Sequence, residues 1–113
     1  MDVHCGASVN YGGYLLGTID SGVVVNVTNS VVVETNAGGS KIGVFARTVN
    51  GTLNIDNSYA VSASRTFTNN EGSGTTNTTN GSQKYTTESA LVTGLANNPS
   101  FQGGFWSTIL SAN

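Results

Sequence analysis

Short apolar strands alternate with small polar turns along the first half of the chain. Residues 17–33 begin with a small-residue turn, continue as a β-branched segment, break at Asn29-Ser30 and resume as a second apolar strand. The same order returns in residues 46–61, with the break at Asn57-Ser58 and matched positions 28 to 30 residues apart. A repeat of this length is typical of architectures built from stacked units.

The main strands are expected at residues 23–27 and 52–55, with shorter ones at 11–16, 31–33, 42–46 and 59–61. In the second main strand Leu53 and Ile55 alternate with polar residues, which is the period-two pattern of a strand with one buried face. In the first, Val23, Val25 and Val27 are expected to point inward. Val24 is then left outside, where it predicts a contact with a partner.

These elements predict an all-β fold, a short parallel β-solenoid (β-helix) of about three coils with a short C-terminal helix and aromatic cap. One coil cannot bury its apolar face alone, so coils must stack. An antiparallel sandwich also has strands spaced by 8 to 12 residues. The repeat favours the solenoid, because a sandwich does not require matching turns one coil apart.

The chain is expected to be a single domain, residues 1–113. It divides into a lead-in (1–10), repeat coils (11–68), a polar loop (69–83) and a C-terminal cap (84–113). Residues 69–82 contain no apolar side chain, so this stretch is predicted to be a projecting mobile loop.

Residues 85–97 are predicted to contain a short helix, with Thr86 or Thr87 as N-cap and Pro99 after its end. A strand at residues 90–92 is the competing interpretation. The apolar residues that follow are expected to cover the exposed end of the core; they are Phe101, Phe105, Trp106, Ile109 and Leu110.

The two Asn-Ser breaks leave two interpretations open. An inward Asn at a corner could form a ladder of hydrogen bonds with its neighbours above and below. A solvent-exposed Asn could instead supply the left-handed backbone of a turn. Neither interpretation implies catalysis.

Composition and charge exclude several functions. Gly, Ser, Thr and Asn make up about half of the chain, against 4 basic and 6 acidic residues. The scattered basic residues and the net charge of −2 give no basic surface for nucleic acid. No apolar run is long enough to insert into a membrane, and no signal peptide is recognised. The Asn/Thr/Gly-rich composition favours an extracellular or cell-surface location.

Candidate chemistry is sparse. Cys5 is the only cysteine, so neither an internal disulfide nor a thiolate-rich metal site can form. It is expected to be a semi-buried thiol, with an intermolecular bridge as the alternative. His4 is the only histidine, and adjacent residues on a strand face opposite ways, which disfavours a His4-Cys5 dyad. No catalytic residue, metal site or cofactor is therefore expected.

Four sequons would accept glycans in a eukaryotic secreted chain, and they begin at Asn26, Asn50, Asn77 and Asn80. In a chain so rich in Asn and Thr, several sequons arise by chance.

Gly12-Gly13-Tyr14-Leu15-Leu16-Gly17 resembles the G-G-L-V-G signature of GLUG repeats, which occur in large bacterial and protist surface proteins and adhesins. Residues 55–61, I-D-N-S-Y-A-V, are also similar to that pattern, and residues 98–106 resemble what often follows the last repeat. The resemblance covers residues 11–64 and 86–110. It implies a β-solenoid at a cell surface and brings no catalytic residues.

We therefore expect a non-catalytic structural or adhesive module that assembles with copies of itself, into an oligomer or fibre, or ends a longer surface protein. The expected assembly or ligand contacts are Val24, Tyr11, Tyr14, Phe105 and Trp106. The alternative is a carbohydrate-binding module that stacks sugars on Tyr11, Tyr14, Tyr59, Tyr85 and Trp106. A polysaccharide-active enzyme is the last alternative.

Overall fold

The computed structural model describes residues 11–34 and 41–102. This part of the chain is mostly β, with short strands and one α-helix. The strands form three parallel sheets of three strands each and one parallel pair. The prediction of a mostly β chain with parallel strands is confirmed.

The chain makes three successive passes through these sheets. The first pass contributes β1 (Tyr11–Gly13), β2 (Leu16–Ile19), β3 (Val24–Thr28) and β4 (Val31–Val33). The second contributes β5 (Lys41–Gly43), β6 (Ala46–Val49), β7 (Thr52–Asp56) and β8 (Tyr59–Val61). The third contributes β9 (Thr68–Asn70), β10 (Thr75–Thr79) and β11 (Gln83–Tyr85).

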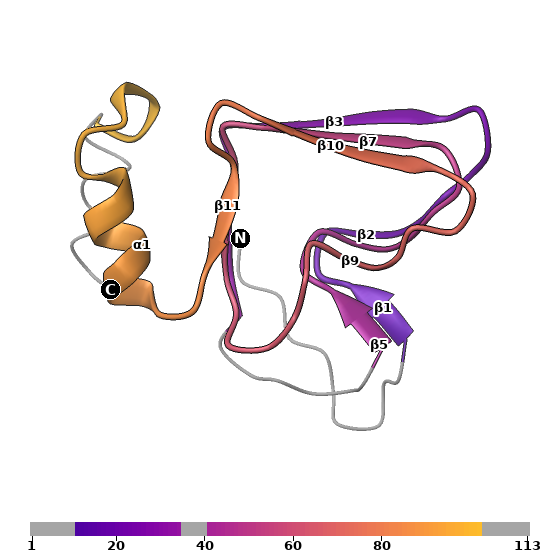
Figure 1. Ribbon diagram of the computed structural model, residues 1–113, viewed down its shortest axis with the longest axis horizontal. Coiled ribbons are helices and arrows are strands. Elements are labelled where there is room, and N and C mark those ends of the chain that lie inside the picture. The colour runs from indigo at the N-terminus through magenta and orange to yellow at the C-terminus, as the bar shows by residue number, and fades with distance from the viewer. Residues whose placement is uncertain (1–10, 35–40, 103–113) are drawn as a thin grey trace.

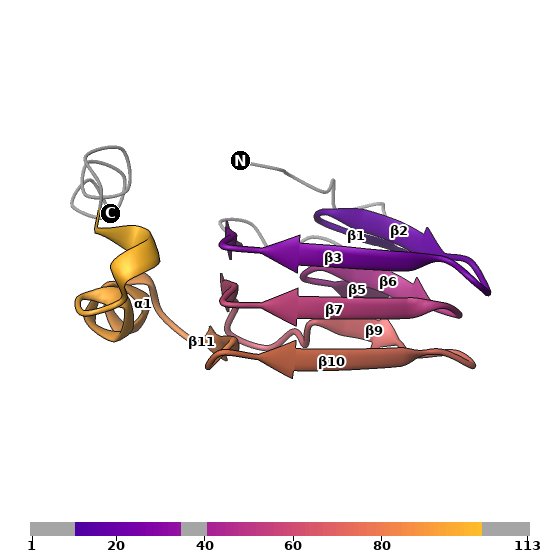
Figure 2. The same cartoon turned by 90° about the horizontal axis from the view of Figure 1, so that it is seen from above.

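Each strand pairs with its counterpart in the next pass, which gives the sheets β2-β6-β9, β3-β7-β10 and β4-β8-β11 and the pair β1-β5. Along the stacking direction the strands of one sheet lie almost over one another (Figure 1). From the side, β3, β7 and β10 form parallel layers (Figure 2). Consecutive passes therefore place side chains in columns that run through the stack.

The polar stretch predicted to be a mobile loop forms most of the third pass instead, so this prediction is wrong. All five residues of β10 pair in parallel register with β7. Thr is β-branched and suits a strand, and the neighbouring strand supplies the backbone partners that a free loop would lack. The third pass lies 22 to 24 residues after the second, a shorter step than the 28 residues between the first two.

The core lies inside the passes. Inward residues of β3, β7 and the neighbouring strands form one buried cluster that includes Val27, Leu53 and Ile55. Val25 lies at its edge, whereas Val23, predicted to point inward, stands at the corner before β3 with 46% of its surface exposed. Phe45 packs against Phe67 with ring centroids 5.0 Å apart. Each buried aliphatic side chain contributes about 1.5–3 kcal/mol relative to exposure.

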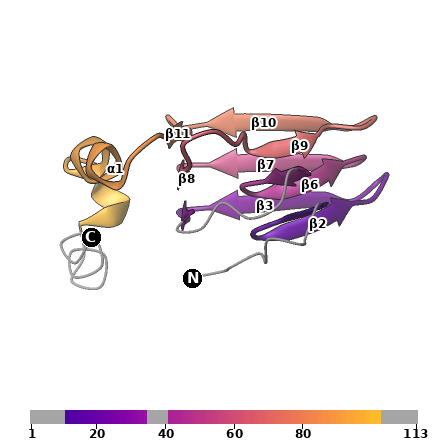
Figure 3. The same ribbon diagram turned by 90° about the horizontal axis from the view of Figure 1, so that it is seen from below.

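A second apolar cluster lies outside the passes, against the outer face of β4-β8-β11. Leu91 and Leu95 of α1 (Glu88–Leu95) and Phe101 of the 3₁₀ helix η1 (Pro99–Phe101) pack here on Tyr59 and Val61. The helix lies beside the stack, next to β11 (Figures 1 and 3). The prediction that the described part of 84–113 covers an end of the core is thus wrong, because the outward apolar residues of β8 need this cover.

The helix begins as predicted. Thr87 is its N-cap, and the Thr87 side chain accepts a hydrogen bond from the Ala90 backbone N–H at 3.2 Å. Asn98 and Pro99 follow its end, where the Asn98 side chain caps η1. The competing strand at residues 90–92 is wrong.

Both interpretations of the Asn-Ser breaks hold in part. Asn29, Asn57 and Asn80 have positive φ values of 49°, 47° and 54°, which is the left-handed turn conformation. Their amides are exposed or half-buried, and Asn57 Nδ2 donates to Asn29 Oδ1 at 2.8 Å. The buried member of the second break is Ser58, whose Oγ accepts from the Ser30 backbone N–H at 3.0 Å.

Glycine is required where the chain bends between β5 and β6. A Cβ on Gly43 would lie 1.8 Å from the Ala46 carbonyl oxygen and 2.7 Å from the Asn69 backbone nitrogen. Gly13 meets the same obstruction in the first pass, 1.8 Å from the Leu16 carbonyl oxygen. Both obstructing groups are backbone, so no side-chain rotation can make room.

We predict that Gly43→Ala destabilises the protein by more than the about 1–3 kcal/mol of ordinary overpacking, because two passes must separate locally. Gly17→Ala is the matched control: Gly17 is an exposed strand glycine with nothing within 4 Å of the added Cβ. It should be neutral or stabilising by about 0.5–1 kcal/mol. Urea unfolding followed by circular dichroism measures both, and equal effects would contradict the close approach at Gly43.

Candidate functional site

The outward face of β3-β7-β10 carries a column of three asparagines. Asn26, Asn54 and Asn77 are register partners. Asn54 Nδ2 donates to Asn26 Oδ1 at 2.9 Å, and Asn77 Nδ2 donates to Asn54 Oδ1 at 3.0 Å. In this Asn ladder, each amide donates to the pass before it, so the ladder has a direction.

The two ends of the Asn ladder are unpaired. Within the described residues, Asn26 Nδ2 has no acceptor and Asn77 Oδ1 has no donor. Both residues are exposed. The first pass therefore ends in a free donor, and the third pass ends in a free acceptor.

The backbone edges of this sheet are open as well. In the described ranges 11–34 and 41–102, β3 pairs only with β7 on one side, and so does β10. Val24 of β3 is 59% exposed, and Val23 is 46% exposed. Val24 faces outward as the sequence predicted, in a column with Thr52 and Thr75. An open strand edge with exposed valines is suited to strand pairing with another chain.

The inward side of the third pass differs from that of the other two. Where the earlier passes place Val25 and Leu53, β10 places Thr76. Lys84 occupies the column of Val32 and Ala60, and its Nζ donates to the Ser62 carbonyl oxygen at 3.0 Å. The stack thus has a more apolar first pass and a more polar third pass.

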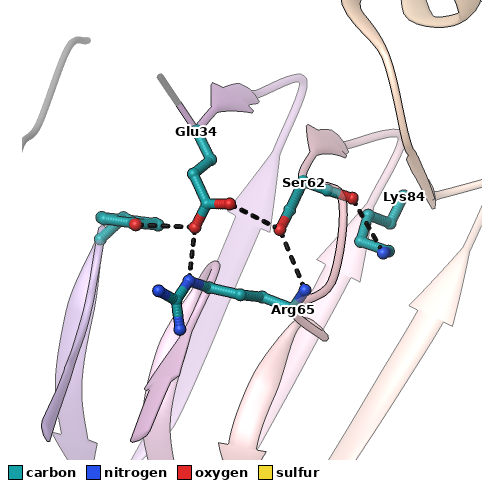
Figure 4. A network of polar contacts seen from close by, with 5 residues as sticks. Glu34, Ser62, Arg65 and Lys84 are labelled. Carbon is teal, nitrogen blue, oxygen red and sulfur yellow. Dashed lines mark hydrogen bonds and ion pairs between the residues drawn. The ribbon is translucent and has the colours of Figure 1, made fainter. Parts of the chain in front are cut away.

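A buried ion pair ties the ends of the first two passes together. Arg65 Nε donates to Glu34 Oε2, and the two side chains are only 9% and 5% exposed. The Tyr14 hydroxyl donates to the same carboxylate oxygen at 2.7 Å, and Ser62 Oγ donates to Glu34 Oε1 at 3.0 Å. Figure 4 shows Ser62 also accepting from the Arg65 backbone N–H.

The network shifts the pKa of its members. Burial alone would raise the pKa of Glu34, but hydrogen bonds from Tyr14, Arg65 and Ser62, together with the Arg65 charge, hold it below its ordinary value. Burial and the hydrogen bond to Glu34 raise the pKa of Tyr14 to about 12. These residues are mutually satisfied and enclosed, which is the arrangement of a structural brace.

A polar cleft of about 620 Å³ opens where the corners of the passes meet the end of α1. It is lined by asparagine side chains, one carboxylate and small residues; these are Asn29, Asp56, Asn57, Asn80, Gly94, Asn97, Asn98, Pro99 and Ser100. Neither this Asn cleft nor the Asn ladder was found from the sequence. The available signal was the shared central Asn of V-V-N-V-T, T-L-N-I-D and T-T-N-T-T.

The predicted contact aromatics do not form one surface. Tyr14 and Tyr59 are each only 5% exposed, and Tyr85 packs in the cluster under α1. Burial therefore removes Tyr14 as an exposed contact and Tyr59 as a sugar-stacking platform. The side chain of Tyr11, together with Phe105 and Trp106, lies outside what is described, as do His4 and Cys5.

The four sequon asparagines occupy different settings. Asn26 and Asn77 are exposed at the ends of the Asn ladder. Asn80 lies at a corner and donates to Asp56. Asn50 is half-buried, and its Oδ1 accepts from the Ser73 backbone N–H at 3.3 Å.

In the described part of the chain, no group of three or more His, Cys, Asp or Glu residues is placed to hold a metal ion. Over the same residues, no helix has the length and apolar character needed to cross a membrane. Comparison of the chain with protein-family models, curated protein sequences and solved structures finds no match.

We predict that Glu34→Gln destabilises the protein by about 3–5 kcal/mol, because it leaves the Arg65 charge buried without its partner. The lowered pKa of Glu34 stabilises the fold above the ordinary value of 4.5, and this contribution is lost as pH falls through the folded-state pKa. The variant should therefore lose part of the acid dependence of unfolding. Glu71→Gln, at an exposed residue, is the control; equal stability of the two variants would contradict the brace.

Tyr14→Phe tests the alkaline side of the same network. Because the pKa of Tyr14 is raised from 10.0 to about 12, its contribution is complete below pH 10.0 and is lost as pH rises toward about 12. Thermal unfolding followed between these values should show a fall in stability in the native protein that is smaller in the variant. Parallel curves for the two proteins would refute the assignment to Tyr14.

Proposed function

We propose that the chain is a parallel β-solenoid module with a structural, non-catalytic role, in which each pass is one coil. The parallel register of three sheets and the columns of matched side chains support this proposal. The resemblance of residues 12–17 and 55–61 to GLUG repeats supports it independently. The same resemblance and the polar composition support an extracellular or cell-surface setting and an adhesive role.

The mode of action proposed here is self-association through the ends of the stack. The supporting observation is the complementarity of the two ends of the Asn ladder. A copy stacked beyond the third pass would bring its Asn26 Nδ2 to Asn77 Oδ1 of the first copy. That bond has the same donor-to-acceptor direction as the two bonds within the chain.

The neighbouring columns fit the same contact. Val25 would follow Leu53 and Thr76 in its inward column, and Val24 would follow Thr52 and Thr75 on the outer face. Threonine retains a γ-methyl group with which valine can pack. The two open edges, β3 and β10, would pair in parallel as β3 and β7 already do.

This contact joins different surfaces of two copies, so it does not close on itself. Heterologous contacts of this kind produce rings or open filaments. When the module ends a longer surface protein, a preceding coil of that protein would occupy the β3 edge in the same way. Both settings use one edge and one bonding pattern.

We predict that the purified chain forms linear assemblies whose size grows with concentration, and that Asn26→Asp weakens them. Asp keeps the oxygen that accepts from Asn54 Nδ2 within the chain, but it has no donor for Asn77 of the next copy and brings a negative charge to that oxygen. Sedimentation velocity and negative-stain microscopy measure assembly, with thermal unfolding as the check on folding.

The control is Asn97→Asp, which makes the same change at an exposed residue beyond α1. It should assemble like the native chain. A native chain that stays monomeric at high concentration would overturn the self-association proposal, and so would an Asn26→Asp variant that assembles normally.

A further inference from the structure

The Asn cleft lies between two parts of the fold that are each held rigidly. One wall is formed by corner residues from all three passes, Asn29, Asn57 and Asn80, together with Asp56. The other wall is the segment between α1 and η1, which Gln102 ties to the helix end by donating its Nε2 to the Leu95 and Ala96 carbonyl oxygens at 3.0 and 2.6 Å. The cleft is therefore preformed.

Some polar atoms of the Asn cleft are used within the protein. Asn98 Nδ2 donates to Asn57 Oδ1 at 2.8 Å and to the Tyr59 hydroxyl at 3.0 Å, which joins the two walls. Asn98 Oδ1 accepts from the Ser100 backbone N–H at 3.1 Å. These bonds lock Asn57 and Asn98 as the base of the cleft.

Other polar atoms of the cleft are left without a partner in the described chain. Asn29 offers Nδ2 as a donor, since only its Oδ1 is bonded. Asp56 Oδ2 and Asn80 Oδ1 are open acceptors, because the other oxygen of Asp56 receives the bonds from Thr79 and Asn80. The Asn97 amide and the Ser100 hydroxyl are unpaired, and both residues are exposed.

This set of groups selects for a particular ligand chemistry. Open donors and acceptors alternate around the cleft, and sugar hydroxyls both donate and accept. The lining residues include no Lys or Arg, which disfavours phosphates and other anions. They include one carboxylate, fewer than the charged oxygen ligands that a tight Ca²⁺ site gathers.

We propose that the Asn cleft binds a neutral carbohydrate with adjacent free hydroxyls. Its volume of about 620 Å³ falls in the range of small-ligand sites, roughly 300–1,000 Å³, and accommodates a mono- or disaccharide. Affinity is modest, because no aromatic ring lines the described cleft for stacking. The proposal is independent of self-association, since the cleft opens beside the stack.

The test is an NMR titration of the ¹⁵N-labelled chain with galactose, mannose, glucose, N-acetylglucosamine and their common disaccharides. The Asn side-chain amides give their own signals, so Asn29 and Asn97 report directly. We expect at least one neutral sugar to shift these signals in a saturable way. Asn97→Ala should weaken that sugar about tenfold, as loss of its hydrogen bonds implies.

The control is Asn69→Ala, which removes an exposed amide on β9 outside the cleft and should leave binding unchanged. Thermal unfolding shows whether each variant is folded. For a second readout, Asp56→Asn should also weaken the sugar. Separate titrations use CaCl₂ and sodium phosphate.

The proposal is overturned if no sugar shifts the cleft signals, or if the shifts lie on another face. It is also overturned if Asn97→Ala binds as well as the native chain, or if only Ca²⁺ or phosphate binds there. Asn26→Asp carries an intact cleft, so sugar binding by this variant separates the fate of this proposal from that of self-association.

Discussion

Parallel pairing in register is the interaction on which the rest of this structure depends. It holds each strand of one pass over its counterpart in the next, so every side chain lies beside a matched position. Apolar columns then form a continuous core around Leu53 and Ile55, and asparagine columns form hydrogen-bonded ladders. The backbone bonds hold even a strand without apolar residues, as β10 demonstrates.

The same constraint makes the ends of the stack different from its middle. β7 has a neighbour on both sides, whereas within the described chain β3 and β10 have one each. The helix does not relieve this, because it covers the apolar outer face of β8. The buried pair of Glu34 and Arg65 joins the ends of the first two passes and stabilises their stacking from within. The surfaces left for interaction are the strand edges and the Asn cleft beside them.

Much of the local structure could be predicted from the sequence, because β-branched alternation and turn residues act locally. The strands around Val25 and Leu53 and the helix capped by Thr87 are examples. The third pass was missed because T-T-N-T-T has no apolar alternation, and its strand depends on pairing with β7. The Glu34 brace and the Asn cleft gather residues far apart in sequence, from different passes and from the segment after α1. Such sites follow from the stacking step, which shortens between the second and third passes in a way that no local pattern reveals.

The most direct test of the stacking account is hydrogen–deuterium exchange measured at low and high protein concentration. Amides on the outer edges of β3 and β10 have no strand partner within the described chain and should exchange quickly in the monomer. The account predicts that exchange slows in both strands as concentration rises, while the amides of β7 change little. Unchanged exchange in β3 and β10, or slowing in β3 alone, would contradict a contact between the first pass of one copy and the third pass of another.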